Sequence, residues 1–330
     1  MANYGAFSAN TIQYGRETTP GTGVAATVVH RGPAADIEDQ REIFHPGKEE
    51  SVGLLVPTDR TYVGKLAAML SVPETELTFE QVCHILEGGI KTATPVGAGP
   101  YVRTYAPPLT STPNAIKTYT METGNKIAGD AHEMAYSFVE SFTLSGKQGE
   151  AWKMSSNWRG RQKVEAALTG SVALQAVEEA LFSKTSLYID ASGGTIGSTQ
   201  KAAVLLEASI TVQTGIQAVF AGDGQLYFTT HKFTRPQFEY SLTFELESGG
   251  IANAERAAME SQALRLVRLS CPGSDSDRLM VIDFAGKHTA VGGYQNSEEN
   301  TTVQISGEAK YSSTDALFFE IEVTNDLTAL

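Results

Sequence analysis

The sequence predicts a mainly-β protein, a sandwich or barrel-like body with one or two helices beside it. Residues 237–247, QFEYSLTFELE, alternate strictly between apolar and polar side chains. Residues 301–311 and 317–325 repeat the same period of two. Such alternation is typical of antiparallel strands that bury one face and expose the other. Many strands with few helical segments favour a sandwich or a barrel.

Two kinds of element complete the predicted body. A helix is expected over 78–88, where Thr78 and Gln81 have the spacing of a capping box. A second helix is expected over 252–262, and 173–182 also has helical spacing. The remaining segments compatible with strands are 117–123, 134–145, 150–158, 186–190, 203–213, 225–230, 263–270 and 279–284.

The chain divides by composition near residue 60. Residues 1–60 are rich in glycine, proline and threonine and predict an extended N-terminal arm and loops, with short strands at most. Residues 61–330 predict a single β domain, and any seam inside it is expected near 165–185. We expect the arm, or the loops after residue 88, to bridge neighbouring copies of the chain.

The charge of the chain disfavours some classes of function. The net charge is −13, and residues 166–330 hold 20 acidic against 10 basic residues. Such a surface is poorly suited to gripping nucleic acid, because phosphate binding needs clustered lysine and arginine. The two cysteines do not form a disulfide framework, so free thiols are expected. No signal peptide or membrane-spanning run is recognised, which predicts synthesis in a cytoplasm.

One short motif resembles part of a nucleotide site. Residues 21–26, GTGVAA, spell the G-x-G-x-x-A of a dinucleotide-binding turn. That turn needs a buried strand before it and a helix after it. The preceding residues, QYGRETTP, make a poor strand, and the following ones do not predict a helix. We therefore expect a flexible lead into the body of the protein and no bound cofactor.

The sequence predicts neither a catalytic site nor a metal site. His132–Glu133 begins like a zinc-protease helix, but Tyr136 stands where the second histidine is needed. Residues 273–277, GSDSD, place carboxylates at alternate positions without the rest of a calcium loop. Neither a nucleophile elbow nor a phosphate-binding loop is present. No enzyme activity is expected.

A basic segment interrupts the acidic trend. Residues 146–163 combine Trp152 and Trp158 with five basic side chains. Aromatic and basic side chains together can bind single-stranded nucleic acid. Two other interpretations are a pair of strands whose tryptophans pack inward, and a basic edge that contacts the acidic surface of other copies. The candidates for subunit contacts are Arg159, Arg161 and Lys163.

The sequence resembles the major tail tube proteins of long-tailed bacteriophages. Four stretches carry the likeness in the order expected for that family: IQYGRETTPGTGVAAT; YTMETG with SFVESFTLSGKQGEAWKMSSNWRGR; TSLYIDASGGTIGSTQ with VLLEASITVQTG; and the C-terminal run from ALRLVRLSCPG to FFEIEVTN. Residues 36–60 and 88–115 carry little of it. The likeness is one of pattern and order, since no single motif is chemically diagnostic.

The resemblance implies a structural virion protein of the phage tail, assembled in the host cytoplasm. Six subunits form a ring, and the rings stack into a tube whose inner strands join a ring-spanning β-barrel. The tube surrounds a tape-measure protein, meets tail-end proteins, and passes DNA during infection. An acidic lining suits such a conduit because it repels phosphates. The alternatives are a virion-surface β-sandwich that acts as an adhesin or binds carbohydrate, and a β-rich enzyme.

Acidic side chains that alternate with apolar ones are candidates for the lining of this lumen. The alternative left open is that some of them face the outer solvent. The candidates are Glu239, Glu245, Glu247, Glu308, Glu320 and Glu322.

Overall fold

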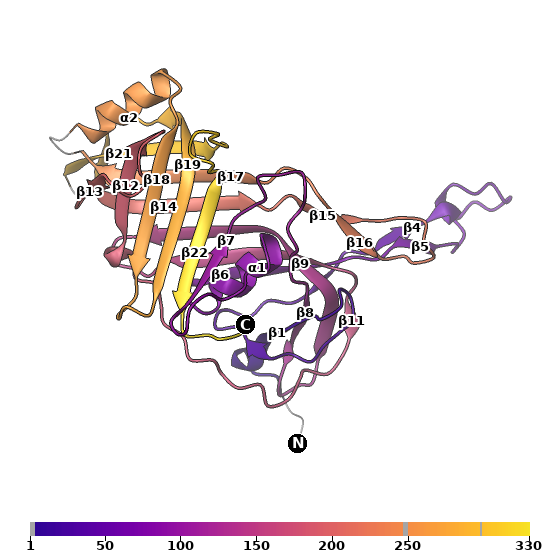
Figure 1. The fold of residues 1–330 in the computed structure, drawn as a ribbon. Coiled ribbons are helices and arrows are strands. Elements are labelled where there is room, and N and C mark those ends of the chain that lie inside the picture. Colours follow the sequence, from indigo (N-terminus) through magenta and orange to yellow (C-terminus); the bar gives the residue numbers. More distant parts are fainter. Residues whose placement is uncertain (1–3, 247–249, 298) are drawn as a thin grey trace.

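The fold is mainly β, as predicted. A computed structural model describes residues 4–246, 250–297 and 299–330. Eighteen strands form one continuous antiparallel sheet that bends into three parts (Figure 1). Two long strands, β9 (Ala131–Lys147) and β19 (Leu279–Val291), each belong to two of these parts. The two bent strands therefore connect the three parts.

The first part, which we call the long sheet, includes the strand that contains residues 237–245. Its strands, in spatial order, are β3 (Glu38–Asp39), β6 (Ala68–Glu76), β10 (Lys153–Gly160), the second half of β9, β14 (Leu205–Gln213), β17 (Gln237–Glu245), β21 (Asn300–Ala309) and the second half of β19, with β20 (Gln295–Ser297) against the start of β21.

The second part, the facing sheet, lies against the long sheet, and its strands cross those of the long sheet (Figure 1). Its strands, in order, are β7 (Tyr101–Tyr105), β22 (Phe319–Asn325), the first half of β19, β18 (Arg265–Pro272), β12 (Ser186–Ala191) and β13 (Gln200–Lys201). The ring of Phe238 on β17 lies 4.9 Å from those of Phe284 and Phe319, centroid to centroid. The alternation of residues 237–245 thus buries one face of a sandwich, as predicted.

The third part, the N-terminal sheet, changes the interpretation of residues 1–60. Its strands, in order, are β2 (Val28–Val29), β1 (Asn10–Arg16), β8 (Tyr119–Asn125), the first half of β9 and β11 (Val164–Glu165). Most of β1 is buried, and the whole strand pairs with β8. Residues 10–16 therefore belong to a sheet of the body. The boundary at residue 60 stays a prediction.

The helices agree with two of the three helical predictions. Helix α1 (Val82–Gly89) lies within the body, and α2 (Ile251–Glu260) covers one end of the long sheet. The Thr78 hydroxyl accepts the backbone N–H of Gln81, but the Gln81 side chain donates to the carbonyl of Val29 instead of closing a capping box. Three short 3₁₀ helices are η1 (Phe7–Ala9), η2 (Pro46–Lys48) and η3 (Phe182–Lys184).

The predicted helix over 173–182 is absent from the described structure. This segment is extended and makes isolated bridges, Thr78 to Glu179 and Ala151 to Leu181. The backbone N–H of Ala180 donates to Leu77, and its carbonyl accepts the N–H of Trp152. Hydrogen bonds to distant strands thus replace the i to i−4 bonds that a helix needs.

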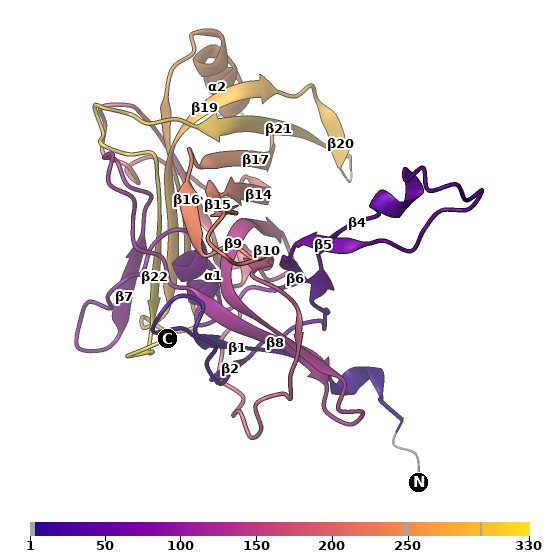
Figure 2. The same cartoon turned by 90° about the vertical axis from the view of Figure 1, so that its right-hand side faces the viewer.

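Two small ribbons lie outside the three sheets. Strands β15 (Ile216–Val219) and β16 (Thr230–Phe233) pair beside the bend of β9. Strands β4 (Glu42–Phe44) and β5 (Tyr62–Lys65) form a hairpin, residues 42–65, that extends far from the body (Figures 1 and 2). We call it the projecting hairpin. The backbone N–H of Leu66 donates to the carbonyl of Leu226 at its base.

Candidate assembly surfaces

The outer face of the long sheet is covered by short polar side chains. Hydrogen bonds join them across strands: Thr143 with Thr211 at 3.2 Å between hydroxyls, and Gln304 with the Ser241 hydroxyl at 2.8 Å. Between these short side chains the face has a hollow of about 290 Å³, at whose rim the longer side chains of Lys147, Lys153 and Glu207 lie. The short polar side chains of the face are Ser71, Ser141, Thr143, Ser145, Ser155, Asn157, Ser209, Thr211, Gln213, Ser241, Thr243, Gln304 and Ser306.

Three of the six predicted lining carboxylates lie on this outer face. Glu239 on β17 stands directly opposite Glu308 on β21, and Glu245 lies further along β17. Glu239 is exposed, whereas the other two are half-buried. Lys310 pairs with Glu308. Glu247 lies outside the described residues.

Most other carboxylates on this face are matched by cations. Lys147 lies 3.4 Å from Glu207, and Lys153 lies 3.6 Å from Glu74, nitrogen to oxygen. These ion pairs offset much of the negative charge that the glutamates bring. The face is therefore polar and hydroxyl-rich rather than strongly acidic.

The other two predicted lining residues point away from this face. Phe319 packs against Phe238 in the core, so its neighbour Glu320 points out of the facing sheet while Glu239 points out of the long sheet. Glu322 shares the side of Glu320. The candidates therefore do not share one face, because alternation identifies the outward positions but not which sheet they leave. Which of the two faces lines a lumen stays a prediction.

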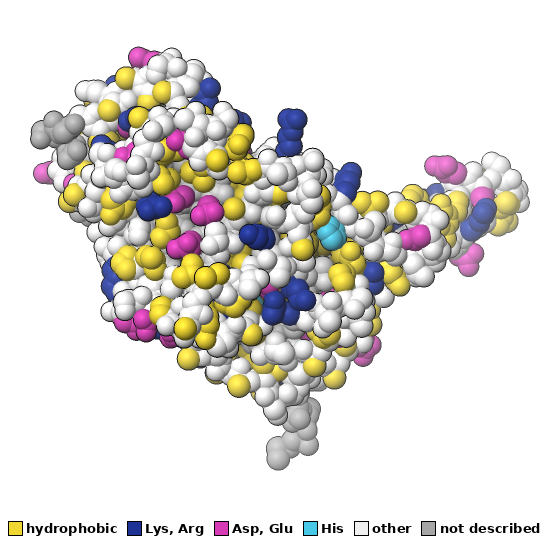
Figure 3. Space-filling model, in the orientation of Figure 1, with side chains coloured by type: hydrophobic (Ala, Val, Ile, Leu, Met, Phe, Trp, Pro, Cys, Tyr) yellow, Lys and Arg dark blue, Asp and Glu magenta, His cyan; other side chains and the backbone are white. Residues whose placement is uncertain are grey.

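Glu320 belongs to a charged cluster on the facing sheet. It stands opposite Asp283, whose carboxylate receives two hydrogen bonds from Arg268 at 2.7 and 2.6 Å. Burial, followed by repulsion from Asp283 and Glu322, raises the pKa of Glu320. Figure 3 shows acidic and basic side chains together over this side of the molecule.

All three basic candidates have partners within the chain. Arg159 makes a two-pronged pair with Glu140, at 3.0 and 3.1 Å. Lys163 lies 2.9 Å from Asp36. The Arg161 guanidinium donates to the carbonyls of Phe228 and Gly21. All three side chains therefore already make hydrogen bonds or ion pairs inside the folded subunit.

Arg161 and Lys163 should differ sharply in what they contribute to stability. Arg161→Ala removes two hydrogen bonds to carbonyls and the guanidinium that lies 4.7 Å above the ring of Tyr136. We expect a loss of about 2–3 kcal/mol in the free energy of unfolding. Lys163→Ala removes one pair with an exposed carboxylate, which costs about 0–1 kcal/mol. Urea unfolding of both variants checks the difference, and equal losses would contradict it.

The tryptophans of the basic segment pack inward. Trp152 and Trp158 are both buried, and Trp158 lies edge-on to Tyr119. The inward-packing interpretation of residues 146–163 is confirmed. A nucleic-acid surface needs aromatic rings that bases can reach, so this segment does not supply one.

The glycine motif at residues 21–26 holds a carboxylate of the protein itself. Gly21 has φ = 79°, and its N–H donates to the buried carboxylate of Glu17 at 2.6 Å. A Cβ at Gly21 would lie 2.1 Å from Arg161. Contrary to the sequence-based expectation, a buried strand, β1, does precede the loop, but the segment that follows is not helical. A phosphate would have to displace Glu17.

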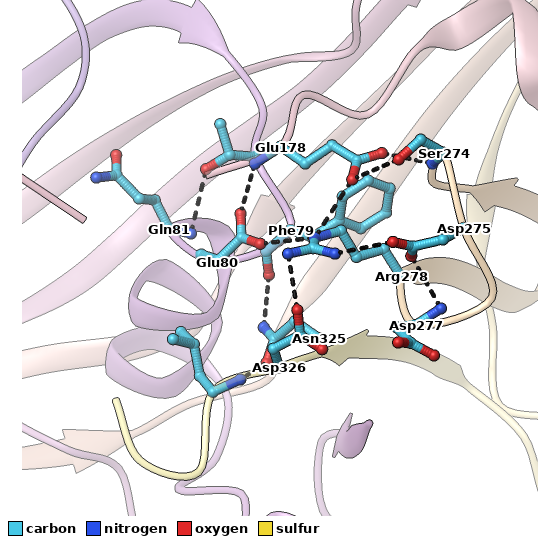
Figure 4. A network of polar contacts seen from close by, with 12 residues as sticks. Phe79, Glu80, Gln81, Glu178, Ser274, Asp275, Asp277, Arg278, Asn325 and Asp326 are labelled. Carbon is cyan, nitrogen blue, oxygen red and sulfur yellow. Dashed lines mark hydrogen bonds and ion pairs between the residues drawn. The ribbon is translucent and has the colours of Figure 1, made fainter. Parts of the chain in front are cut away.

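Residues 273–277 form an exposed turn, and Asp275 in this turn contacts the guanidinium of Arg278. Figure 4 shows the guanidinium among four carboxylates: Asp326 at 2.8 Å, Glu80 at 3.1 Å, and Glu178 and Asp275 at 3.4 Å. Through Arg278, the cluster connects Glu80, which precedes α1, with Asp326 in the C-terminal segment. Within the described ranges, no group of three or more histidine, cysteine or acidic residues is arranged to hold a metal ion.

A buried polar network that the sequence does not reveal holds α2 in place. Glu255 of α2 forms a two-pronged pair with Arg265 and accepts from His288 Nε2 at 2.8 Å. The other ring nitrogen of His288 lies 2.7 Å from the Tyr240 hydroxyl. Tyr240, His288 and Glu255 resemble a proton relay, but each is at most 3% exposed, so a substrate has no access to them.

The projecting hairpin is the other surface that sequence reasoning missed. Phe44 and Tyr62 stack near its base with centroids 5.2 Å apart, and Leu54, Leu55 and Val56 lie exposed at its tip. Figure 3 shows hydrophobic side chains along this extension. The signal was the run GLLVP at residues 53–57, which is apolar inside a segment otherwise rich in charge.

The scan against protein-family models and the search of curated proteins find no match to this chain. Among the residues that the structure describes, no helix is both long and apolar enough to cross a membrane.

Proposed function

We propose that the chain is a non-enzymatic structural subunit whose copies assemble into a tube of stacked rings. The number of copies per ring, six, comes from the tail tube proteins that the sequence resembles. In this proposal the tube belongs to a phage tail, assembles in the host cytoplasm around a tape-measure protein, and meets tail-end proteins at its tips. DNA passes through without specific binding.

The observation that carries the proposal is the long sheet, with its hydroxyl-rich outer face and an edge strand on each side. Within the described chain, β6 beyond residue 69 pairs only with β10. Residues 287–291 of β19 pair only with β21, although α2 packs beside this part of β19. Open edges present unpaired N–H and C=O groups that another strand can use. Copies placed side by side would join their long sheets into a closed barrel.

The same geometry favours one of the two acidic faces as the lining. If the long sheets close into a barrel, its hydroxyl-rich face with Glu239, Glu245 and Glu308 lies inside. Glu320 and Glu322 then lie on the outside of the tube. Short side chains leave an open passage, and cations already paired with carboxylates offer DNA phosphates little to bind.

The alternative, a surface adhesin that binds carbohydrate, is less well supported. A sugar site of that kind needs aromatic rings gathered on an exposed surface, and both tryptophans are buried. The exposed pair Phe44 and Tyr62 lies at the base of the projecting hairpin, and the two rings stack on each other.

Electron microscopy of the purified protein tests the proposal. We expect rings or tubes at micromolar concentrations, because open edges and exposed apolar side chains favour association. Compact particles of single-subunit size at every concentration would reject assembly and favour the adhesin. Light scattering on the same sample serves as a control for mass.

A further inference from the structure

The tip of the projecting hairpin carries apolar side chains that its own subunit does not cover. Leu54 is 63% exposed, Leu55 is fully exposed, and Val56 is 67% exposed. The tip lies far from the body in both views (Figures 1 and 2). Contiguous apolar side chains on a protruding segment are typical of an interaction site. The flanks are charged: Glu49 and Asp59 lie there with Lys48 and with the ion pair between Glu50 and Arg60.

A groove on the body has the complementary character. Two adjoining hollows of about 700 and 390 Å³ share five lining residues: Pro107, Pro108, Thr110, Arg235 and Pro236. The smaller hollow continues over apolar side chains, including Phe233, and among the residues that the structure describes Arg235 is the only charged one that lines it. The larger hollow is also lined by Glu239, Glu308 and Lys310. Its volume suits a few aliphatic side chains. We call the two hollows together the proline groove.

We propose that the hairpin tip of one subunit docks in the proline groove of a second copy of this chain. The side chains of Leu54, Leu55 and Val56 would fill the smaller hollow. Among the described residues, neither Arg235 nor the tip residues Glu49 and Asp59 has an ion pair of its own. Their opposite charges therefore meet on docking, with Arg235 at the wall of the groove.

The occupant is a second copy because the tip cannot reach the groove of its own subunit. The groove lies on the body beside β16 and β17, whereas the tip extends away from the body (Figure 1). The contact is head-to-tail, since each copy offers one tip and one groove. Repeating it builds either a closed ring or an open filament. The inference rests on the proposed function only in requiring that copies associate.

Disulfide cross-linking tests the contact directly. Leu55→Cys is combined with Thr110→Cys, at an exposed position lining the groove. Cys83 and Cys271 are buried, so they provide little background. Mild oxidation should give a ladder of covalent multimers, because every copy carries both halves. The control pairs Leu55→Cys with Leu174→Cys, which is exposed elsewhere on the body, and should give no ladder.

The outcomes separate this contact from assembly as a whole. Rings or tubes without a ladder from the tip and groove pair would overturn the docking and leave the proposed function standing. A ladder from Leu55→Cys alone would indicate contact between tips and would also overturn it. Sedimentation of the wild-type protein as a monomer at every concentration would reject both proposals.

A charge at the tip gives a second, independent measurement. Leu55→Glu should weaken association by about tenfold to hundredfold, because it removes a leucine from the groove. Leu174→Glu introduces the same charge at another exposed leucine and should leave association unchanged. Thermal melting should match the wild type for both, as neither side chain packs in the core. Unchanged sedimentation of Leu55→Glu would contradict the docking.

Discussion

Replacing Glu255 by alanine should cost about 3–5 kcal/mol of the free energy of unfolding. The substitution leaves Arg265 and His288 facing a cavity without the carboxylate that both contact. Burial alone would raise the pKa of Glu255, but hydrogen bonds from Arg265 and His288 outweigh it and hold the pKa below its usual value. The folded state therefore favours the ionised carboxylate, and alanine cannot replace it.

Urea unfolding measures this loss, with hydrogen exchange over residues 251–260 as a local readout. Glu260→Ala is the matched control, since Glu260 lies exposed on the same helix and should change stability by less than about 0.5 kcal/mol. We expect α2 to lose protection in Glu255→Ala and to keep it in the control. A loss below about 1 kcal/mol in Glu255→Ala would contradict the role of the network.

Acid should begin to destabilise the protein at pH values well above those at which carboxylates normally titrate. Burial, with smaller effects from Arg16 and Arg103, lowers the pKa of His84 from 6.5 to about 3, and burial lowers that of His30 to about 4. Between pH 6.5 and these values the unfolded chain binds protons that the folded chain excludes. Stability therefore falls as pH falls.

The contacts of His84 explain why its ring stays neutral. The Tyr119 hydroxyl donates to Glu87 at 2.8 Å, so His84 Nδ1 donates to the tyrosine oxygen at 3.1 Å. The other nitrogen, Nε2, is buried and has no partner among the described residues. A proton added there would bring a buried charge without an acceptor.

The loss between pH 7.5 and pH 5 should be on the order of 4 kcal/mol for the two histidines together. Glu133 and Glu320, whose pKa values are raised chiefly by burial, act in the opposite sense and offset a part of it. Denaturant unfolding across this range measures the slope. His84→Gln should reduce this slope by the equivalent of about one proton taken up on unfolding. His45→Gln, at an exposed position, should leave the slope unchanged. A slope unchanged in His84→Gln would contradict this assignment.

Periodicity predicted the sandwich because a half-buried antiparallel strand alternates apolar and polar side chains, and this alternation can be recognised within a few residues. Phe238, Tyr240, Leu242 and Phe244 are all buried, as their spacing requires. The pattern ends before the sequence suggests, because Leu246 lies past the end of β17 and is 40% exposed. Alternation predicts which face is buried but not how far the pairing extends.

Pairing over long distances explains what the prediction of elements missed. Residues 10–16 contain Gln13 and Arg16 and do not look like a core strand. Gln13 is buried, and its amide nitrogen donates to the Glu122 carboxylate and to the carbonyl of Thr169. Such partners, more than 100 residues away, cannot be recognised from a local window of sequence.

The candidate surfaces were predicted only in part, for the same reason. Outward positions such as Glu239 and Glu320 were identified, but their opposite directions depend on the fold of the two sheets. The partners of Arg161 come from residues 21 and 228, so its role inside the subunit has no local signal. The sequence shows the apolar run at the tip. Only the structure shows that this run is exposed on a projecting hairpin and is therefore a candidate contact surface.

A three-dimensional reconstruction of the assembled protein tests the central claim most directly. We expect a tube of rings whose lumen is lined by the outer face of the long sheet, with Thr211, Ser241 and Glu239 toward the centre and Glu320 on the outside. The long sheets of neighbouring copies should be continuous through their edge strands. A protein that stays monomeric, or a tube with Glu320 toward its lumen, would contradict the account.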